Sequence, residues 1–482
     1  MKASAKKRSK SPKKVNKKRA RRQKSLRDQQ LEMINPNAAG IDVASEEMWV
    51  CVPEDRVDQP QGNVRKFGAF TCDLYAIADW LQECGVTSVA MESTGIYWIP
   101  LYQVLEERGF EVCLVNARQM KNVSGRPKTD RLDCRWIQRL HSYGLLMPSF
   151  RPEDEICQLR SLLRHRDAVI RGAARHIQHM QKALHQMNIL LDKVISDITG
   201  VTGTAIISQI LAGERDPQTL ATWRNPHIKT SEAEIAKALE GDYRDEHLFV
   251  LRQAFEAYHF AQEQLQVCDR TIEGWLQRTE KILDVRDHPL PSSTRCHRRP
   301  QRNEPTYEAR SYLYEIYGVD LTQIPGFQAS TVQTLLSEVG RDLTKWKTEK
   351  HFTSWLGLCP NLKRSGGKDQ SSRTRKVQSR AAQAFRNAAR PLARSSSYLG
   401  AFYRRMKARL GTAKAITATA RKLAVIFYQM VTQGRAYKEL GEDYYLKQHK
   451  QRQLKRLKKQ ARLFGFDLVP NTPSDSDTSA LS

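Results

Sequence analysis

The fold is decided by the stretch from residue 39 to residue 52. It opens with the apolar run Ala39-Gly40-Ile41-Asp42-Val43 and then alternates through Trp49-Val50-Cys51-Val52. This pattern predicts strands near 39–44 and 47–53. Further strand patterns follow near 64–70, 86–92 and 110–116, and helix patterns near 73–84, 97–108 and 130–142. Three leading strands followed by alternating helices and strands predict a mixed sheet with helices on both faces over residues 37–150.

Four carboxylates stand out within this domain. Asp42 lies in the first strand, and Glu92 closes the run Val86-Thr87-Ser88-Val89-Ala90-Met91 in the fourth. Asp130 and Asp133 open a helix pattern in Lys128-Thr129-Asp130-Arg131-Leu132-Asp133, and their spacing places both on one helical face. This order of strands and acids is that of a ribonuclease H-like domain. The four acids are therefore expected to converge.

Clustered carboxylates repel one another unless cations neutralise them, and Mg²⁺ prefers oxygen ligands. Two such ions can activate the attacking oxygen and stabilise the leaving oxygen at a phosphodiester. A single Asp or Glu is more often a solvated charge or a helix N-cap, and Asp130 sits where a cap would. Asp42 and Glu92 fit that interpretation less well because each closes an apolar run. The set predicts a metal-dependent phosphoryl-transfer enzyme.

The charge of the chain indicates the substrate. The net charge is +27 over 482 residues, with a pI near 9.8. Residues 2–27 hold fourteen Lys or Arg and no acid, and residues 363–422 hold seventeen against one acid, Asp369. Residues 447–462 add a further basic tract. Such stripes favour a phosphate backbone as partner over a membrane surface, because no broad apolar face or membrane-length run accompanies them.

The nine cysteines are scattered, odd in number and never in C-x-x-C spacing. That pattern argues against a disulfide framework and a zinc finger, and predicts a reducing, cytoplasmic location. The basic N-terminus has no apolar core segment of a secretory signal. Residues 1–36 are expected to be a disordered polybasic arm.

Residues 151–283 carry two heptad series. The first, in a helix expected over 155–196, runs from Ile156 to Val194 and is interrupted only by Arg166; the second runs from Leu248 to Leu283. These helices either fold back on each other or pair between subunits, and the sequence leaves both open. Residues 199–245 are expected to form small helical turns at the tip.

A Pro- and Arg-rich linker is expected over 284–310, a helical domain over 311–435, and a basic helix with a disordered tail over 436–482. Leu321-Thr322-Gln323-Ile324-Pro325-Gly326-Phe327 and the helix pattern after it have the form of a helix-hairpin-helix, whose turn could aim N–H groups at a phosphate. An ordinary helix–turn–helix packing element remains an equal alternative.

Ser365 lies in the second segment of chemical interest, Asn361-Leu362-Lys363-Arg364-Ser365-Gly366-Gly367-Lys368. The glycines allow close backbone approach, and the flanking cations would stabilise a phosphate and a serine alkoxide. Ser-Gly-Gly is also common turn chemistry. The residues expected to bind nucleic acid here are Lys363, Arg364, Lys368, Arg373, Arg375 and Lys376.

These motifs together are specific. The chain resembles the DEDD-type insertion-sequence transposases, also known as bridge-RNA-guided recombinases, over about residues 37–142 and 318–432. The first block matches through Gly40-Ile41-Asp42-Val43, Met91-Glu92-Ser93-Thr94-Gly95 and Lys128-Thr129-Asp130-Arg131-Leu132-Asp133. The second matches through Ile324-Pro325-Gly326, Trp355-Leu356-Gly357-Leu358-Cys359-Pro360 and Ser365-Gly366-Gly367.

The resemblance implies an enzyme that recombines DNA strands to move its own element. It implies a domain similar to Holliday-junction resolvases in which Asp42, Glu92, Asp130 and Asp133 bind Mg²⁺, with two ions expected per site. It further implies that Ser365 attacks DNA and forms a covalent intermediate, and that a non-coding bridge RNA pairs with donor and target DNA. Dimers that join into a tetramer, with active sites composed across subunits, are also implied. The polybasic arm and the stretch 284–306 depart from the family pattern and leave the mode of RNA binding open.

Two alternatives remain. The first keeps the metal site but lets water attack, as in a Holliday-junction nuclease, with Ser365 only a turn residue. The second is a non-catalytic scaffold that binds RNA or DNA. The sequence does not give the guide RNA, the target site or the host.

Overall fold

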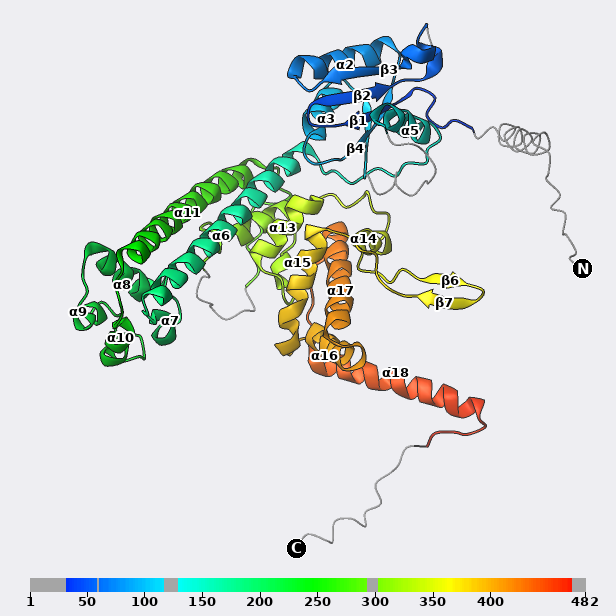
Figure 1. Cartoon of the computed structure of the whole chain (residues 1–482). Helices are drawn as coiled ribbons and strands as arrows, with labels where there is room; N and C mark the ends of the chain where they lie inside the picture. Colours follow the sequence, from blue (N-terminus) through cyan, green and yellow to red (C-terminus); the bar gives the residue numbers. More distant parts are fainter. Residues whose placement is uncertain (1–31, 59, 117–128, 293–301, 470–482) are drawn as a thin grey trace, which may run out of the picture. The chain divides into compact units, whose positions relative to one another are not determined.

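The computed structural model describes residues 32–58, 60–116, 129–292 and 302–469. The chain divides into two compact units, residues 1–151 and 152–482, and each is treated by itself (Figure 1). Most of the arm expected over 1–36, the centre of the linker expected over 284–310 and the end of the C-terminal tail lie outside the described residues. No helix within the described ranges is long and apolar enough to cross a membrane.

The first unit is built on a five-stranded mixed sheet in the order β3-β2-β1-β4-β5. Strands β1 (Ala38–Val43), β2 (Glu47–Cys51) and β3 (Val64–Gly68) are antiparallel neighbours, whereas β4 (Ser88–Glu92) and β5 (Glu111–Val115) run parallel to β1. The short 3-10 helices η1 (Glu54–Arg56) and η2 (Pro60–Asn63) join β2 to β3. The predicted mixed sheet with the two acids on its first and fourth strands is confirmed.

Side chains on each strand alternate between the two faces of this sheet. Ile41 and Met91 face the main core with α2 (Thr71–Glu83) and α3 (Trp98–Glu107), where Ile77, Leu81 and Leu105 are fully buried. Ala90 belongs to a smaller core on the other face, against α5 (Asp130–Ser142). Helices therefore cover both faces, as expected (Figure 1).

The second unit begins with a helical hairpin. Helix α6 (Asp154–Gln186) packs along α11 (Asp245–Arg278), and a buried ion pair joins Arg166 to Asp269 with Nε and Oδ1 2.5 Å apart. The apolar seams of both heptad series therefore meet within one chain. Arg166, which breaks the first series, has its own partner across the seam.

The helix expected over 155–196 ends ten residues early, which corrects that boundary. Asn188 adopts a left-handed conformation (φ 57°), and the Met187 carbonyl, instead of continuing a helix, accepts a hydrogen bond from Asp242 N at 2.9 Å. The heptad pattern could not reveal this break because Ile189, Leu191 and Ile195 still belong to the same core. The separate short helix α7 (Leu191–Val194) takes up part of the remaining segment. The turns expected over 199–245 are α8 (Val201–Ala212), α9 (Pro217–Ala221) and α10 (Glu232–Leu239).

The C-terminal helices surround an aromatic core. Phe327, Phe352, Phe385 and Phe427 are fully buried and contact one another ring to ring. The elements are, in chain order, α12 (Ala309–Tyr317), η3 (Leu321–Gln323), α13 (Ala329–Val339), α14 (Glu349–Trp355), β6 (Lys363–Ser365), β7 (Lys368–Ser371), α15 (Arg380–Ala389), η4 (Arg390–Arg394), α16 (Tyr398–Leu410), α17 (Thr412–Gln433) and α18 (Gly441–Leu463).

Candidate active site

Asp42 and Glu92 lie on neighbouring parallel strands. The β1–β4 register pairs Ala38 with Ser88 and Ile41 with Met91, so the next position along brings Asp42 beside Glu92 at the carboxyl ends of both strands. Each is one residue past a side chain of the α2–α3 core. Both carboxylates therefore belong to the opposite face of the sheet, which α5 covers.

Helix α5 runs antiparallel to β1 and β4. Near its end, His141 Nε2 lies 2.7 Å from Ser88 Oγ at the start of β4, and Gln138 Nε2 donates to the Ala38 carbonyl at 3.2 Å. The start of the helix therefore extends toward the strand ends that carry the first two acids. Asp130 and Asp133 occupy that first turn. Asp42 and Glu92 thus lie at the carboxyl ends of two central strands, and Asp130 and Asp133 lie in the first turn of the helix that packs on the same face.

Gly40 allows this approach. A Cβ atom built on Gly40 would lie 2.2 Å from Gln138 N and 2.5 Å from the Cys134 carbonyl oxygen. No side chain fits there, so the backbone of α5 can rest directly on β1. The glycine next to Ile41-Asp42 therefore sets the depth at which the helix and its two carboxylates sit.

The surroundings of the four acids differ. Asp42, Glu92 and Asp133 are half-buried and Asp130 is exposed. The Thr94 hydroxyl donates to Glu92 Oε1 at 2.8 Å, a contact that sequence reasoning missed although Thr94 stands two residues away. Within the described residues, no three His, Cys, Asp or Glu side chains are arranged to hold a metal ion. The donor set is nevertheless all carboxylate oxygen, which suits Mg²⁺.

Ser365 lies in the second unit, at the tip of an exposed two-stranded hairpin. β6 and β7 pair with Ser365 opposite Lys368, and the two residues between them, Gly366 and Gly367, both have positive φ (55° and 76°). That is the backbone of a two-residue type I′ turn. The expected Ser-Gly-Gly turn is present, and the serine itself is exposed.

The cations expected to bind nucleic acid divide into two groups. Arg364 Nε pairs with Asp369 Oδ1 across the hairpin at 2.7 Å, and Arg375 donates to the Ser354 carbonyl. These two brace the hairpin and its base. The other four, Lys363, Lys368, Arg373 and Lys376, are exposed along the same hairpin and the segment after it.

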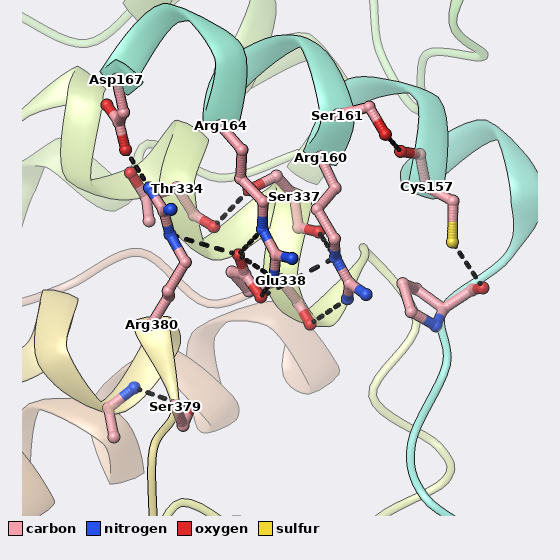
Figure 2. A network of polar contacts seen from close by, with 12 residues as sticks. Cys157, Arg160, Ser161, Arg164, Asp167, Thr334, Ser337, Glu338, Ser379 and Arg380 are labelled. Carbon is pink, nitrogen blue, oxygen red and sulfur yellow. Dashed lines mark hydrogen bonds and ion pairs between the residues drawn. The ribbon is translucent and has the colours of Figure 1, made fainter. Parts of the chain in front are cut away.

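A network of polar contacts, drawn in Figure 2, joins the start of α15 to α6 and α13. Glu338 of α13 accepts hydrogen bonds from Nε and Nη2 of Arg164 in α6 at 3.0–3.2 Å. Arg380, the first residue of α15, forms ion pairs with Glu338 and Asp167. Arg160 adds hydrogen bonds to the carbonyls of Ser337 and Glu338. The network fixes the start of α15 to α6 and α13, and thereby the point from which the hairpin segment emerges.

Family comparisons match two parts of the chain. Residues 39–189 match a DEDD transposase family of IS110 elements, and residues 320–404 match the family described as Transposase IS116/IS110/IS902. No curated protein matches the chain. The first match contains all four carboxylates and the second contains Ser365. With both domains present in this order, the chain belongs to the IS110 family of insertion-sequence transposases and is a DNA transposase.

Proposed function

We propose that this transposase cuts and rejoins DNA strands through a covalent serine–DNA intermediate, with Mg²⁺ bound by Asp42, Glu92, Asp130 and Asp133. The proposal is supported by the placement of Asp42 and Glu92 at the carboxyl ends of neighbouring strands, and of Asp130 and Asp133 in the first turn of the helix that packs on the same face. This segment matches a DEDD transposase family. DEDD domains of this kind are typically metal-dependent.

Two Mg²⁺ ions are expected at this site. When bound, they would stabilise negative charge on the reacting phosphate and on the oxygen that leaves it. The protein's own part is to present four carboxylates on a rigid sheet and helix. Thr94 assists by donating to Glu92 Oε1, which holds that carboxylate at the strand end. Gly40 assists by letting α5 lie flat on β1.

In the proposed reaction, the Ser365 Oγ attacks the phosphorus of a DNA phosphodiester. A bond forms between Oγ and phosphorus, the bond from phosphorus to one sugar oxygen breaks, and that oxygen takes up the proton which the serine gives away. Attack by a sugar hydroxyl of another strand reverses these steps and frees the serine. The phosphoester bond energy is conserved, so strands are exchanged without an external energy source.

The choice of DNA site is proposed to rest on a structured non-coding RNA that pairs with donor and target. The support is electrostatic: seventeen Lys or Arg against one acid in residues 363–422, and fourteen in residues 2–27. Assembly as dimers that join into a tetramer belongs to the same proposal, because strand exchange needs more than one cutting site.

The decisive experiment traps the intermediate on labelled DNA in Mg²⁺. The Ser365→Ala protein is expected to bind DNA as before but to yield no covalent adduct and no recombinant product. Ser371→Ala and Ser372→Ala are the matched controls in the same hairpin segment and should both form the adduct.

Three other outcomes contradict parts of the proposal. An adduct that survives Ser365→Ala but not one of the two controls moves the nucleophile to that control position. Mg²⁺-dependent cutting with no adduct in the unmodified protein indicates a nuclease that uses water. Binding without any cutting indicates a scaffold.

A further inference from the structure

Helix α18 lies outside both family-matched segments, and its charge is one-sided. From Tyr444 to Phe466 the chain holds eight Lys or Arg and no acidic residue. The two acids of the helix, Glu442 and Asp443, lie in its first turn. Beyond its first turn the helix therefore carries only positive charge, and its two acids lie at the end that joins the rest of the chain.

The root of α18 is fixed to α16. Tyr445 is only 4% exposed and meets the rings of Tyr398 and Phe402 edge-on at 4.9 and 6.4 Å between centroids. Glu442 Oε1 pairs with Arg404 at 2.6 Å. These contacts give the helix a firm base and a set direction from α16.

Beyond its root, α18 is exposed to solvent. Residues 450–460 and 462–469 are all exposed, and Figure 1 shows the helix continuing past α16 on its own. Helical periodicity places seven of the eight basic side chains on one half of the helix, the basic side. Lys450 lies on the other half, within a narrow stripe that holds Leu446, Leu454 and Leu457. Lys455, Lys458, Lys459 and Arg462 line a hollow of about 410 Å³ on the basic side.

Further cations crowd the root of the helix. Lys422 of α17 faces Arg452, and His449 faces both Arg405 and Arg452. Burial is the first cause of the lowered pKa of Lys422 and of His449, and these like charges lower both further. Glu442 does not relieve the crowding, because it already pairs with Arg404. An anionic partner would relieve this repulsion.

We propose that α18 binds duplex DNA, with its basic side against the phosphates of the major groove. From Lys447 to Arg462 the helix is about 23 Å long, which spans about 13 phosphate charges of a duplex. Its diameter of about 10–12 Å matches the major groove of B-DNA, whereas the major groove of an RNA duplex is too narrow for such a helix. DNA is already the substrate of this enzyme class, and the surface adds a contact beyond the cutting site.

Charge also argues against a second copy of the chain as the occupant. Two α18 helices paired along the leucine stripe would bring sixteen Lys or Arg together with no acid between Tyr444 and Phe466 to offset them. An anionic lipid surface would also attract the basic side chains, but it has no groove that matches the diameter of the helix. Both occupants become outcomes of the test.

The test measures binding of a 30-base-pair DNA duplex at several salt concentrations. All proteins carry Ser365→Ala, so the result does not depend on the covalent mechanism. The variant Lys455→Ala/Lys458→Ala/Arg462→Ala removes three charges from the basic side of α18. The matched control Lys229→Ala/Lys237→Ala/Arg270→Ala removes three exposed charges from α11 and from the turns between α6 and α11.

The α18 variant is expected to bind DNA at least about ten-fold more weakly at 0.15 M salt. Its plot of log affinity against log salt should be shallower by about 2.7, because each lost phosphate contact removes about 0.9 from the slope. The control should change the slope by less than about 0.9, the value for one phosphate contact. Equal behaviour of variant and control overturns the proposal.

Three parallel measurements identify another occupant if there is one. An RNA duplex of the same sequence that loses more affinity than the DNA overturns the assignment to DNA. Loss of binding to vesicles with phosphatidylserine, with DNA binding intact, assigns the helix to a membrane. A change of oligomeric state in Leu454→Ala/Leu457→Ala, measured by sedimentation, assigns the stripe to a second copy.

Discussion

Among the four proposed metal ligands, Asp42 gives the clearest test, because it lies beside Glu92 at the strand ends and is the only acid on β1. We expect Asp42→Asn to reduce DNA cleavage in Mg²⁺ at least about a hundred-fold, since a lost ligand removes several kcal/mol of stabilisation from the reacting phosphate. DNA binding should persist, because the basic segments are unchanged. Cleavage of end-labelled DNA measures the effect.

The control for that variant is Glu46→Gln, which makes the same carboxylate-to-amide change at an exposed position between β1 and β2. It should cut at the normal rate. If Asp42→Asn cuts as well as Glu46→Gln, the four-carboxylate metal site is wrong.

His141 makes the stability of the α/β unit depend on pH. It is 6% exposed, and burial lowers its pKa from the ordinary 6.5. The unfolded chain therefore binds a proton at a higher pH than the folded one. Stability is full above about pH 6.5 and falls as the pH drops toward the folded pKa, by no more than about 1.4 kcal/mol per pH unit.

Thermal unfolding between pH 7.5 and 5.5 measures this dependence, and His141→Gln should flatten it. No other histidine lies within residues 1–151, so the assignment is unambiguous within that unit. His165→Gln, at an exposed position of α6, should leave the dependence as it is. An unchanged pH profile in His141→Gln would count against a neutral, buried imidazole at Ser88.

At the scale of elements, a buried ion pair joins α6 to α11 within an otherwise apolar interface. Arg166 and Asp269 are 8% and 2% exposed at their side chains. Asp269→Asn leaves a buried guanidinium without its counter-charge, so we expect a loss of about 3–5 kcal/mol in the free energy of unfolding. Urea unfolding followed by helical circular dichroism measures it.

The matched comparison is Glu232→Gln, which breaks the more exposed pair with Arg224 and should cost no more than about 1 kcal/mol. The double variant Arg166→Leu/Asp269→Leu should recover most of the loss, because no lone charge remains buried. A cost for Asp269→Asn no greater than that for Glu232→Gln would show that Arg166 finds another partner.

Element boundaries show how far a sequence pattern reaches. The strands of the first unit and helix α5 lie within two or three residues of their predicted positions, because strict apolar runs between turn residues specify them locally. The end of α6 was missed because the contact between Met187 and Asp242 joins residues far apart in the chain. The sequence also did not reveal that most of α18 is exposed, because exposure depends on which other elements pack against a helix.

The candidate site also has features that follow from the sequence and one that does not. That Asp42 and Glu92 meet follows from two parallel strands, and the paired spacing of Asp130 and Asp133 follows from helix geometry. The depth of α5 does not follow from any motif. It depends on the absence of a side chain at Gly40, whose role becomes visible only when Cys134 and Gln138 are seen against it.

For the whole molecule, charge is expected to govern binding more than shape. Deleting residues 1–28 removes fourteen of the cations without touching a described element. We expect weaker binding of RNA and DNA and a shallower dependence on salt, with an unchanged unfolding midpoint. Filter binding across a salt series tests it; an unaltered affinity and slope would assign the arm another role, such as solubility.

The turn at Gly366 and Gly367 has a consequence for comparing relatives of this protein. Both residues sit in left-handed conformations, where an L-amino acid with a side chain is strained. Selection for the shape of the hairpin alone would preserve both glycines through evolution. Invariance of this dipeptide among relatives would therefore report backbone geometry and carry no information about catalysis, whereas invariance of the neighbouring serine, which the turn itself does not require, would.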